Sequence, residues 1–161
     1  MKILLVGEYS GLHNSLKKGL IQLGHDVTLI SNGDGFKDYP SDYKIKAVTF
    51  NKNLIFNTFF KVFRKFQIID IEKLEIGIRA YNILKKTKEF DIVQLININS
   101  FDTYPIVEKK IISLLDKKSA KMFLLSAGTD YYSVKFAIEK KFKYSILTPL
   151  FEKKNDQKDF K

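Results

Sequence analysis

The sequence contains no cysteine, only two histidines, and no long apolar run without charges. The lack of cysteine excludes a disulfide framework and a cysteine-ligated metal site, and two histidines are too few to favour a zinc site. A membrane-spanning helix needs roughly 20 consecutive apolar residues, and no stretch approaches this without a charge. An apolar run begins at Lys2 and leaves no room for a signal peptide, so a soluble, cytoplasmic protein is expected.

Cationic residues outnumber acidic ones. Lys and Arg total 28 against 18 Asp and Glu, which gives a formal net charge of +10. Such a surface attracts polyanions, which include nucleic acid, anionic lipid and phosphate-bearing substrates. No zinc finger, RRM signature or paired recognition helix is present, so nucleic acid is not an expected partner. With 161 residues, 45% of them hydrophobic, the chain is long and apolar enough for one domain with a real core.

The segment 1–31 has the pattern strand, polar loop, helix, glycine, strand. Lys2–Val6 is an apolar run typical of a strand that is buried on both faces. Four leucines then recur at helical spacing on one face, namely Leu12, Leu16, Leu20 and Leu23. Gly24 can end that helix in the left-handed conformation, and Val27–Ile30 is a second β-rich run. The pattern predicts two parallel strands joined by a right-handed helical crossover.

Strand and helix patterns alternate through the rest of the chain. Strands are expected at Tyr43–Phe50, Asp91–Ile96 and Ser119–Ser126, the last of them buried, and helices at Asp70–Phe90, Pro105–Lys117 and Tyr131–Phe142. This alternation is typical of α/β proteins with a parallel sheet. The sequence therefore predicts a three-layer, Rossmann-like α/β domain over residues 1–150, with a mainly parallel sheet flanked by helices. Residues 151–161 are interpreted as a polar tail or the start of an interdomain connection.

Two short segments resemble a known family. Leu23–Val27 (LGHDV) is similar to part of the opening of GT-B glycosyltransferases, and Phe90–Val93 (FDIV) is similar to the phrase that introduces a later strand of their first domain. The whole chain resembles the N-terminal, acceptor-side domain of such an enzyme, closest to the retaining, sugar-nucleotide-dependent bacterial family. Gln94 and Asn97 depart from that family, which often has a histidine near this point.

The resemblance implies a hexosyltransferase that transfers a sugar from a nucleotide-sugar donor to a glycan or lipid-linked acceptor in cell-surface polysaccharide biosynthesis. The donor-binding C-terminal domain has no counterpart within these 161 residues. The chain is therefore expected to be a fragment or a separate subunit that needs this domain or a partner chain. It is expected to be inactive alone, because catalysis needs donor and acceptor aligned. No cofactor and no metal are expected, since the nucleotide-sugar is a substrate.

Asp130 is the catalytic candidate. The resemblance places it after the expected strand 119–126, where the family commonly has a histidine or aspartate facing the transferred sugar. Its carboxylate could accept a hydrogen bond from a sugar hydroxyl or support positive charge that develops at the anomeric carbon. From the residues alone, capping of the helix that begins at Tyr131 explains Asp130 equally well.

Loops that follow the expected strands supply the substrate-binding candidates, because ligands of open α/β sheets bind outside the carboxyl ends of the strands. The candidates are Gly7, Tyr9, Ser10, Gly11, His13, Asn97, Asn99, Asp102 and Gly128. Amide side chains suit hydroxyl groups, which need paired donors and acceptors. The backbone amides of 7–11, at a helix start, could face a donor phosphate. Turn formation and helix capping explain part of the same polar residues.

Residues 51–66 form a basic, phenylalanine-rich amphipathic segment that can lie in a membrane interface. The side chains expected to face the membrane are Phe59, Lys61, Phe63, Arg64 and Lys65. The resemblance favours this interpretation, because related enzymes approach lipid-linked acceptors with this part of the first domain. A peripheral position on the inner face of an anionic plasma membrane follows from it. The alternative is that the phenylalanines belong to the core and the lysines form a solvated rim.

Two functions from other classes stay open. One is a non-catalytic, flavodoxin-like binding or membrane-docking module. The other is a nucleotide-binding oxidoreductase, which the first loop does not favour, because Gly7 and Gly11 do not form the GxGxxG pattern. NAD binding is therefore not expected, and Asp34 is interpreted as an ordinary loop carboxylate.

Overall fold

The computed structural model describes residues 1–48, 70–128, 131–139 and 147. They belong to two units, Met1–Leu125 and Ser126–Lys161, and each unit is treated by itself. The predictions for Asp130 and for the membrane-facing residues lie outside the described residues. The residues that were expected to face a membrane are Phe59, Lys61, Phe63, Arg64 and Lys65.

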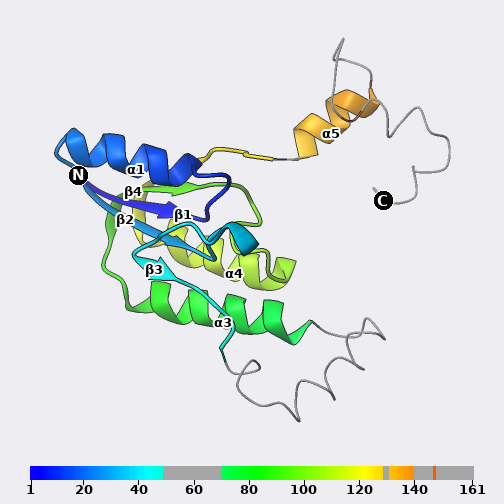
Figure 1. The fold of residues 1–161 in the computed structure, drawn as a ribbon, viewed down its shortest axis with the longest axis horizontal. Coiled ribbons are helices and arrows are strands. Elements are labelled where there is room, and N and C mark those ends of the chain that lie inside the picture. Colours follow the sequence, from blue (N-terminus) through cyan, green and yellow to red (C-terminus); the bar gives the residue numbers. More distant parts are fainter. Residues whose placement is uncertain (49–69, 129–130, 140–146, 148–161) are drawn as a thin grey trace. The chain divides into compact units, whose positions relative to one another are not determined.

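The first unit is built on a five-stranded, all-parallel sheet (Figure 1). Its strands are β1 (Lys2–Val6), β2 (Asp26–Ser31), β3 (Tyr43–Lys44), β4 (Phe90–Leu95) and β5 (Ser119–Leu124). Their order across the sheet is β3-β2-β1-β4-β5. This architecture confirms the predicted Rossmann-like α/β fold. The order of strands reverses between β1 and β4, which is where open α/β sheets form their ligand crevice.

Helices cover both faces of the sheet. They are α1 (Leu12–Gln22), α3 (Ile71–Lys86) and α4 (Pro105–Asp116). On one face, Leu16 and Leu20 of α1 pack against β1 and β2. On the opposite face, α3 and α4 lie together against the sheet (Figure 1). Because successive strand residues point to opposite faces, the unbroken apolar run of β1 contributes to both cores, with Leu4 and Val6 on the α3–α4 face and Ile3 and Leu5 on the α1 face.

The two edge strands differ from their predictions. β3 is limited to Tyr43–Lys44, shorter than the expected strand that starts at the same residue. β5 was expected to be a buried strand, yet Phe123 is 50% exposed and Leu124 is 49% exposed. The reason is its position: β5 pairs with β4 alone, so one side of the strand has no neighbouring strand among the described residues.

The leucine stripe of α1 is buried only in its middle. Leu16 and Leu20 are partly buried against the sheet, whereas Leu12 is 47% exposed and Leu23 is 73% exposed. Leu23 lies just past the helix, which ends before Gly24. Gly24 has φ 80°, as expected for a glycine that ends a helix in the left-handed conformation.

The described part of the second unit is mainly one helix, α5 (Tyr131–Ile138). The rings of Tyr131 and Tyr132 meet edge to face, with their centroids 5.4 Å apart. Gly128, before the helix, has φ 88°, a conformation that favours glycine.

Candidate functional site

The candidate site is the carboxyl edge of the sheet, where the loops after β1 and β4 meet. Gly7, the first residue after β1, has φ 83°, and a methyl group built on it would lie 2.3 Å from Cγ2 of Ile96 and 2.8 Å from the carbonyl oxygen of Ser100. The two loops therefore touch at their bases, and only glycine allows this approach. The Gly7 amide also donates to the carbonyl of Ile30 at 2.8 Å, which joins the first loop to the end of β2.

Two carboxylates, one in the first loop and one after β2, bond to backbone amides of the first loop and of the start of α1. Glu8 is 4% exposed, and its carboxylate accepts hydrogen bonds from the amides of Tyr9 at 2.8 Å and Asn14 at 2.9 Å. Asp34, after β2, accepts from the amide of Ser10 at 2.8 Å. These amides are the donors that a Rossmann-type site would offer to a phosphate. Here they are bonded to carboxylates of the chain itself, so a phosphate would have to displace them.

Asp34 and Lys37 connect the loops that follow β1 and β2. Lys37 lies in the short 3₁₀ helix η1 (Gly35–Lys37) and pairs with Asp34 at 2.8 Å. Burial acts to raise the pKa of Asp34, but the bonds from Lys37 and from the Ser10 amide outweigh it, so the pKa lies below its usual value. Lys37 also donates to the Ser10 hydroxyl at 2.9 Å and lies 5.8 Å from the centre of the Tyr9 ring. The sequence interpretation of Asp34 as an ordinary loop carboxylate missed this role.

His13 lies beneath the first loop and does not reach its surface. The side chain is fully buried, and its Nδ1 is 2.7 Å from the carbonyl oxygen of Gly7. Because a carbonyl only accepts, Nδ1 carries the proton, and Nε2 faces the amide of Gln94 at 3.5 Å. Burial lowers the pKa of His13 despite the opposing effects of the Gly7 carbonyl and the Glu8 charge, which favours the neutral ring. His13 thus positions the loop, and Gln94 is part of the same contact.

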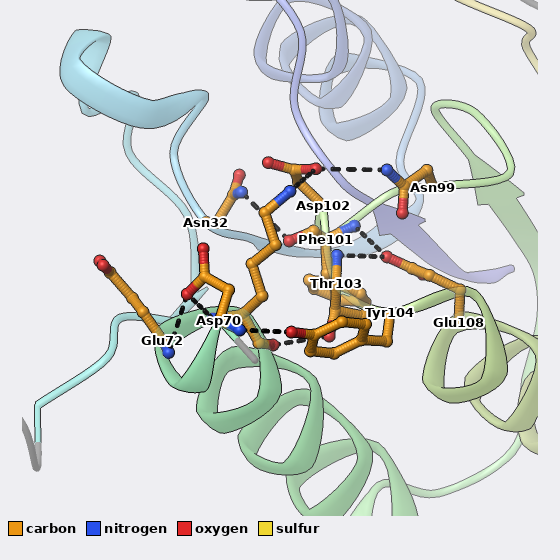
Figure 2. A network of polar contacts seen from close by, with 10 residues as sticks. Asn32, Asp70, Glu72, Asn99, Phe101, Asp102, Thr103, Tyr104 and Glu108 are labelled. Atoms are coloured by element: carbon orange, nitrogen blue, oxygen red, sulfur yellow. Dashed lines mark hydrogen bonds and ion pairs between the residues drawn. The ribbon is translucent and has the colours of Figure 1, made fainter. Parts of the chain in front are cut away.

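The loop after β4 carries polar side chains at its tip (Figure 2). The Asn97 side chain accepts from the amide of Asn99 at 2.9 Å, and the Ser100 hydroxyl donates to the carbonyl of Asn97 at 2.6 Å. The Asn99 amide group donates to Asp102 at 3.3 Å, and Lys73 of α3 pairs with the same carboxylate at 2.9 Å. These bonds fit the turn-forming interpretation, yet Asn99 and Asp102 remain exposed. Both side chains are therefore held in place by hydrogen bonds and are also exposed to solvent.

Glu108 of α4 supports this loop from below. Its side chain is 4% exposed, and its Oε1 accepts from the amides of Phe101 at 3.0 Å and Thr103 at 3.3 Å (Figure 2). Burial raises the pKa of Glu108 above its usual value, even though the two amide bonds favour the charged form.

Helix α3 supports the loop from the other side. The Thr103 hydroxyl donates to the carbonyl of Lys73 at 2.6 Å, and the Tyr104 hydroxyl accepts from the amide of Asp70 at 2.5 Å. A methyl group built on Gly77 would lie 2.5 Å from the Thr103 hydroxyl oxygen, so α3 approaches the loop closely at this glycine. None of these supporting residues was a sequence candidate.

The predicted binding residues therefore divide into groups. Tyr9, Ser10, Asn99 and Asp102 lie exposed on the two loops, Asn97 and Gly11 are part of the loop turns, and Gly7 and His13 are buried beneath. Gly128 belongs to the second unit, and Asp130 lies outside the described residues. An additional bond, from the Asn32 side chain to the carbonyl of Phe101 at 3.4 Å, joins the loop after β2 to the loop after β4.

Among the described residues, no three His, Cys, Asp or Glu side chains come together in a group that could hold a metal ion. In the same part of the chain, no helix has both the length and the apolar character to cross a membrane. Comparison with protein-family models finds no match for this chain, and comparisons with curated proteins and with solved structures find none either.

Proposed function

We propose that the chain is the acceptor-binding half of a glycosyltransferase and that the carboxyl edge of its sheet binds a hydroxyl-rich acceptor. The observation that carries the proposal is two pairs of exposed, pre-positioned side chains, Tyr9 with Ser10 and Asn99 with Asp102, on the loop tips that flank the reversal of strand order. Open α/β sheets bind ligands outside the carboxyl ends of their strands, at the point where the strand order reverses. The tips supply amide, hydroxyl, carboxylate and aromatic groups, which are the partners that sugar hydroxyls and sugar faces require.

The charges of the first loop favour a neutral ligand over a phosphate there. Glu8 and Asp34 already accept the amides of Tyr9, Asn14 and Ser10. A phosphate brought to the same amides would be repelled by the two carboxylates. It would also displace the hydrogen bonds that the carboxylates now make with these amides. We therefore assign the diphosphate of the nucleotide-sugar to a second domain or partner chain. The carboxyl edge of this sheet is assigned to the acceptor.

Sugar transfer as the reaction is supported by the resemblance of Leu23–Val27 and Phe90–Val93 to GT-B enzymes and by the strand order that such a domain requires. The enzyme would move a hexose from a nucleotide-sugar to a glycan or lipid-linked acceptor in cell-surface polysaccharide biosynthesis. Asp130 is proposed as the residue that faces the transferred sugar. A peripheral position at an anionic membrane, through residues 51–66, belongs to the same proposal.

Titration followed by amide-resolved NMR tests the acceptor site on the 161-residue chain. The probes are a panel of neutral mono- and oligosaccharides, together with UDP and UDP-glucose. We expect saccharides to shift the amides of residues 9–11 and 97–102, and UDP to leave them unchanged. The Asn99→Ala and Asp102→Asn variants should weaken saccharide binding roughly tenfold, the loss of about 1.4 kcal/mol.

The matched controls are Asn82→Ala, an exposed asparagine of α3, and Asp116→Asn, an exposed aspartate of α4. Both should bind saccharides as the unmodified chain does. Saccharide binding that survives the loop substitutions, or a UDP site at residues 9–11, would contradict the assignment. A different result would be that saccharides bind at the loops but the native protein has no donor-binding domain or partner. This result would favour a non-catalytic binding module over the transferase half.

A further inference from the structure

The outer seam between α3 and α4 forms an apolar hollow of about 780 Å³. It is separate from the loops of the candidate site, because it lies along the helices themselves. The lining residues are Leu74, Ile78, Tyr81, Ile106, Val107, Lys109, Lys110, Ser113, Leu114 and Lys117. Both isoleucines of the lining are well exposed, Ile78 at 49% and Ile106 at 68%. Apolar side chains gathered in one hollow, and not scattered singly, mark an interaction surface.

The hollow arises from the way each helix divides its apolar residues. The inner face of α3 contributes Ala80 and Leu84 to the core, and the inner face of α4 contributes Ile111 and Leu115. On α3, a second apolar row runs through Leu74, Ile78 and Tyr81, spaced four and three residues apart, which places it on one side of the helix. Tyr81 of this row also packs against the core, but Ile78 stays 49% exposed, so the described residues cover only part of the row.

Close packing fixes the floor of the hollow. A methyl group built on Gly77 would lie 2.6 Å from Cγ1 of Val107, so α3 and α4 approach each other directly at this point. Thr103 and Lys73 are joined by a hydrogen bond of 2.6 Å at the same end of the helices. The hollow is therefore formed before any partner arrives, which lowers the entropic cost of binding.

The rim of the hollow is positively charged. Lys109, Lys110 and Lys117 line it, and none of the ten described lining residues is acidic. A second copy of this chain, with its net charge of +10, would bring more positive charge to this rim. An apolar partner with acidic flanks would instead complement it, because opposite charges across an interface favour encounter and specificity.

We propose that this hollow binds an acidic amphipathic helix of a partner protein. Helix α4 has 12 residues and is about 18 Å long, so the seam accommodates a partner helix of about three turns. Its apolar residues, at spacings of three and four, enter between Ile78 and Ile106, and its carboxylates meet the three lysines. This is the helix-in-groove mode of recognition. A recessed hollow suits the ridge of a helix better than the flat surface of a bilayer.

The test uses a stapled 14-residue peptide, with leucines at three- and four-residue spacing flanked by glutamates, and measures its binding by fluorescence anisotropy. We expect saturable binding that weakens as salt is added, because the lysine contacts are screened. The same peptide with lysines in place of the glutamates should not bind. Amide-resolved NMR should place the shifts on α3 and α4, away from residues 9–11 and 97–102.

The Ile106→Ser/Lys110→Glu double variant should weaken peptide binding by roughly tenfold or more, which corresponds to about 1.4 kcal/mol. The matched control is Ile21→Ser/Lys18→Glu on α1, where the isoleucine is 50% exposed. Both double variants replace exposed residues, and their NMR spectra report whether the fold is retained. The proposal is overturned if the acidic peptide does not bind, or if it binds the Ile106→Ser/Lys110→Glu variant unchanged. It is also overturned if only phosphatidylserine vesicles bind through these residues, since the surface would then be a membrane contact.

Discussion

The loops after β1 and β4 are each held by a buried glutamate, but their supports weaken under opposite changes of pH. In each, a glutamate that is 4% exposed accepts two backbone amides: Glu8 bonds to Tyr9 of the first loop and to Asn14 in the first turn of α1, and Glu108 bonds to Phe101 and Thr103 of the second loop. Glu8 precedes its helix, whereas Glu108 lies inside its helix and reaches back. Beneath the first loop there is also a neutral histidine, His13, which the second loop lacks. The two loops that border the crevice are therefore both held by hydrogen bonds to buried side chains, but different titrating groups support them.

The pKa shifts of these groups have opposite consequences for stability. His13 has a lowered pKa in the folded protein, so its contribution is present above the usual value of 6.5 and is lost as the pH falls through the folded value. Glu108 has a raised pKa, so its contribution is present below the usual value of 4.5 and is lost as the pH rises through the folded value. Acid therefore weakens the support of the first loop, while rising pH weakens the support of the second.

The largest predicted effect is that of Gly7→Ala, which pushes the two loops apart at their shared base. The new methyl group would meet Ile96 at 2.3 Å in a backbone conformation with φ 83°. We expect a loss of about 2–4 kcal/mol in the free energy of unfolding, measured by urea denaturation, from overpacking together with backbone strain.

Gly24→Ala is the matched control for Gly7→Ala. Gly24 has φ 80°, but a methyl group there would have no neighbour within 4 Å. It should therefore show the backbone cost alone, about 1 kcal/mol. Equal losses in the two variants would mean that the contact between the loops is not tight.

His13→Phe is predicted to have an intermediate effect, confined to the first loop. Phenylalanine keeps an aromatic ring, slightly larger than the imidazole, but leaves the Gly7 carbonyl without its 2.7 Å hydrogen bond, which should cost about 1–3 kcal/mol at neutral pH. The part of the acid destabilisation that belongs to His13, at and below pH 6.5, should disappear in the variant. The measurement is the unfolding midpoint in urea across pH 4.5 to 8.

His25→Gln serves as the control, since it removes the other histidine of the chain. It should keep the full acid-side loss of stability. If His13→Phe loses as much stability on acidification as the unmodified chain does, then the buried ring is not the source of that loss.

The central strands and helices could be predicted from sequence because their signals are local. The apolar run of β1 and the β-rich run of β2 lie in a pattern of strand, helix and glycine that a short window contains. The position of a strand in the sheet, by contrast, depends on segments that are far apart in the sequence. The exposure of Phe123 and Leu124 follows from the edge position of β5, which the order of five strands decides and a short window does not show.

The candidate site was predicted at the level of loops and not of side-chain roles. Exposed Asn99 and Asp102 follow a strand, as the rule for open sheets requires. His13 was expected to bind substrate from a loop, yet it lies in α1, three residues before Leu16, which packs against the sheet. Glu108 lies three residues before the buried Ile111 in the same way. This spacing places both groups on the inner face of a helix, so it is a sequence signal that could have identified them.

Glu108→Gln is predicted to have the smallest effect on stability and the clearest dependence on pH. Glutamine keeps the side-chain oxygen that accepts the amides of Phe101 and Thr103 at 3.0 and 3.3 Å, but it cannot ionise. The unmodified chain should lose stability as the pH rises from 4.5 through the raised pKa of Glu108, and the variant should lack this component. At neutral pH the two should differ by less than about 1 kcal/mol, because the desolvation of a carboxylate is exchanged for weaker hydrogen bonds.

The control for Glu108→Gln is Glu89→Gln, an exposed glutamate before β4 whose substitution should leave the pH profile unchanged. Urea denaturation at intervals between pH 4 and 8 measures all three proteins. If Glu108→Gln and the unmodified chain have parallel profiles, the pKa of the Glu108 carboxyl is the same in the folded and unfolded states. The opposite pH responses of the two loops would then reduce to a single response, that of His13.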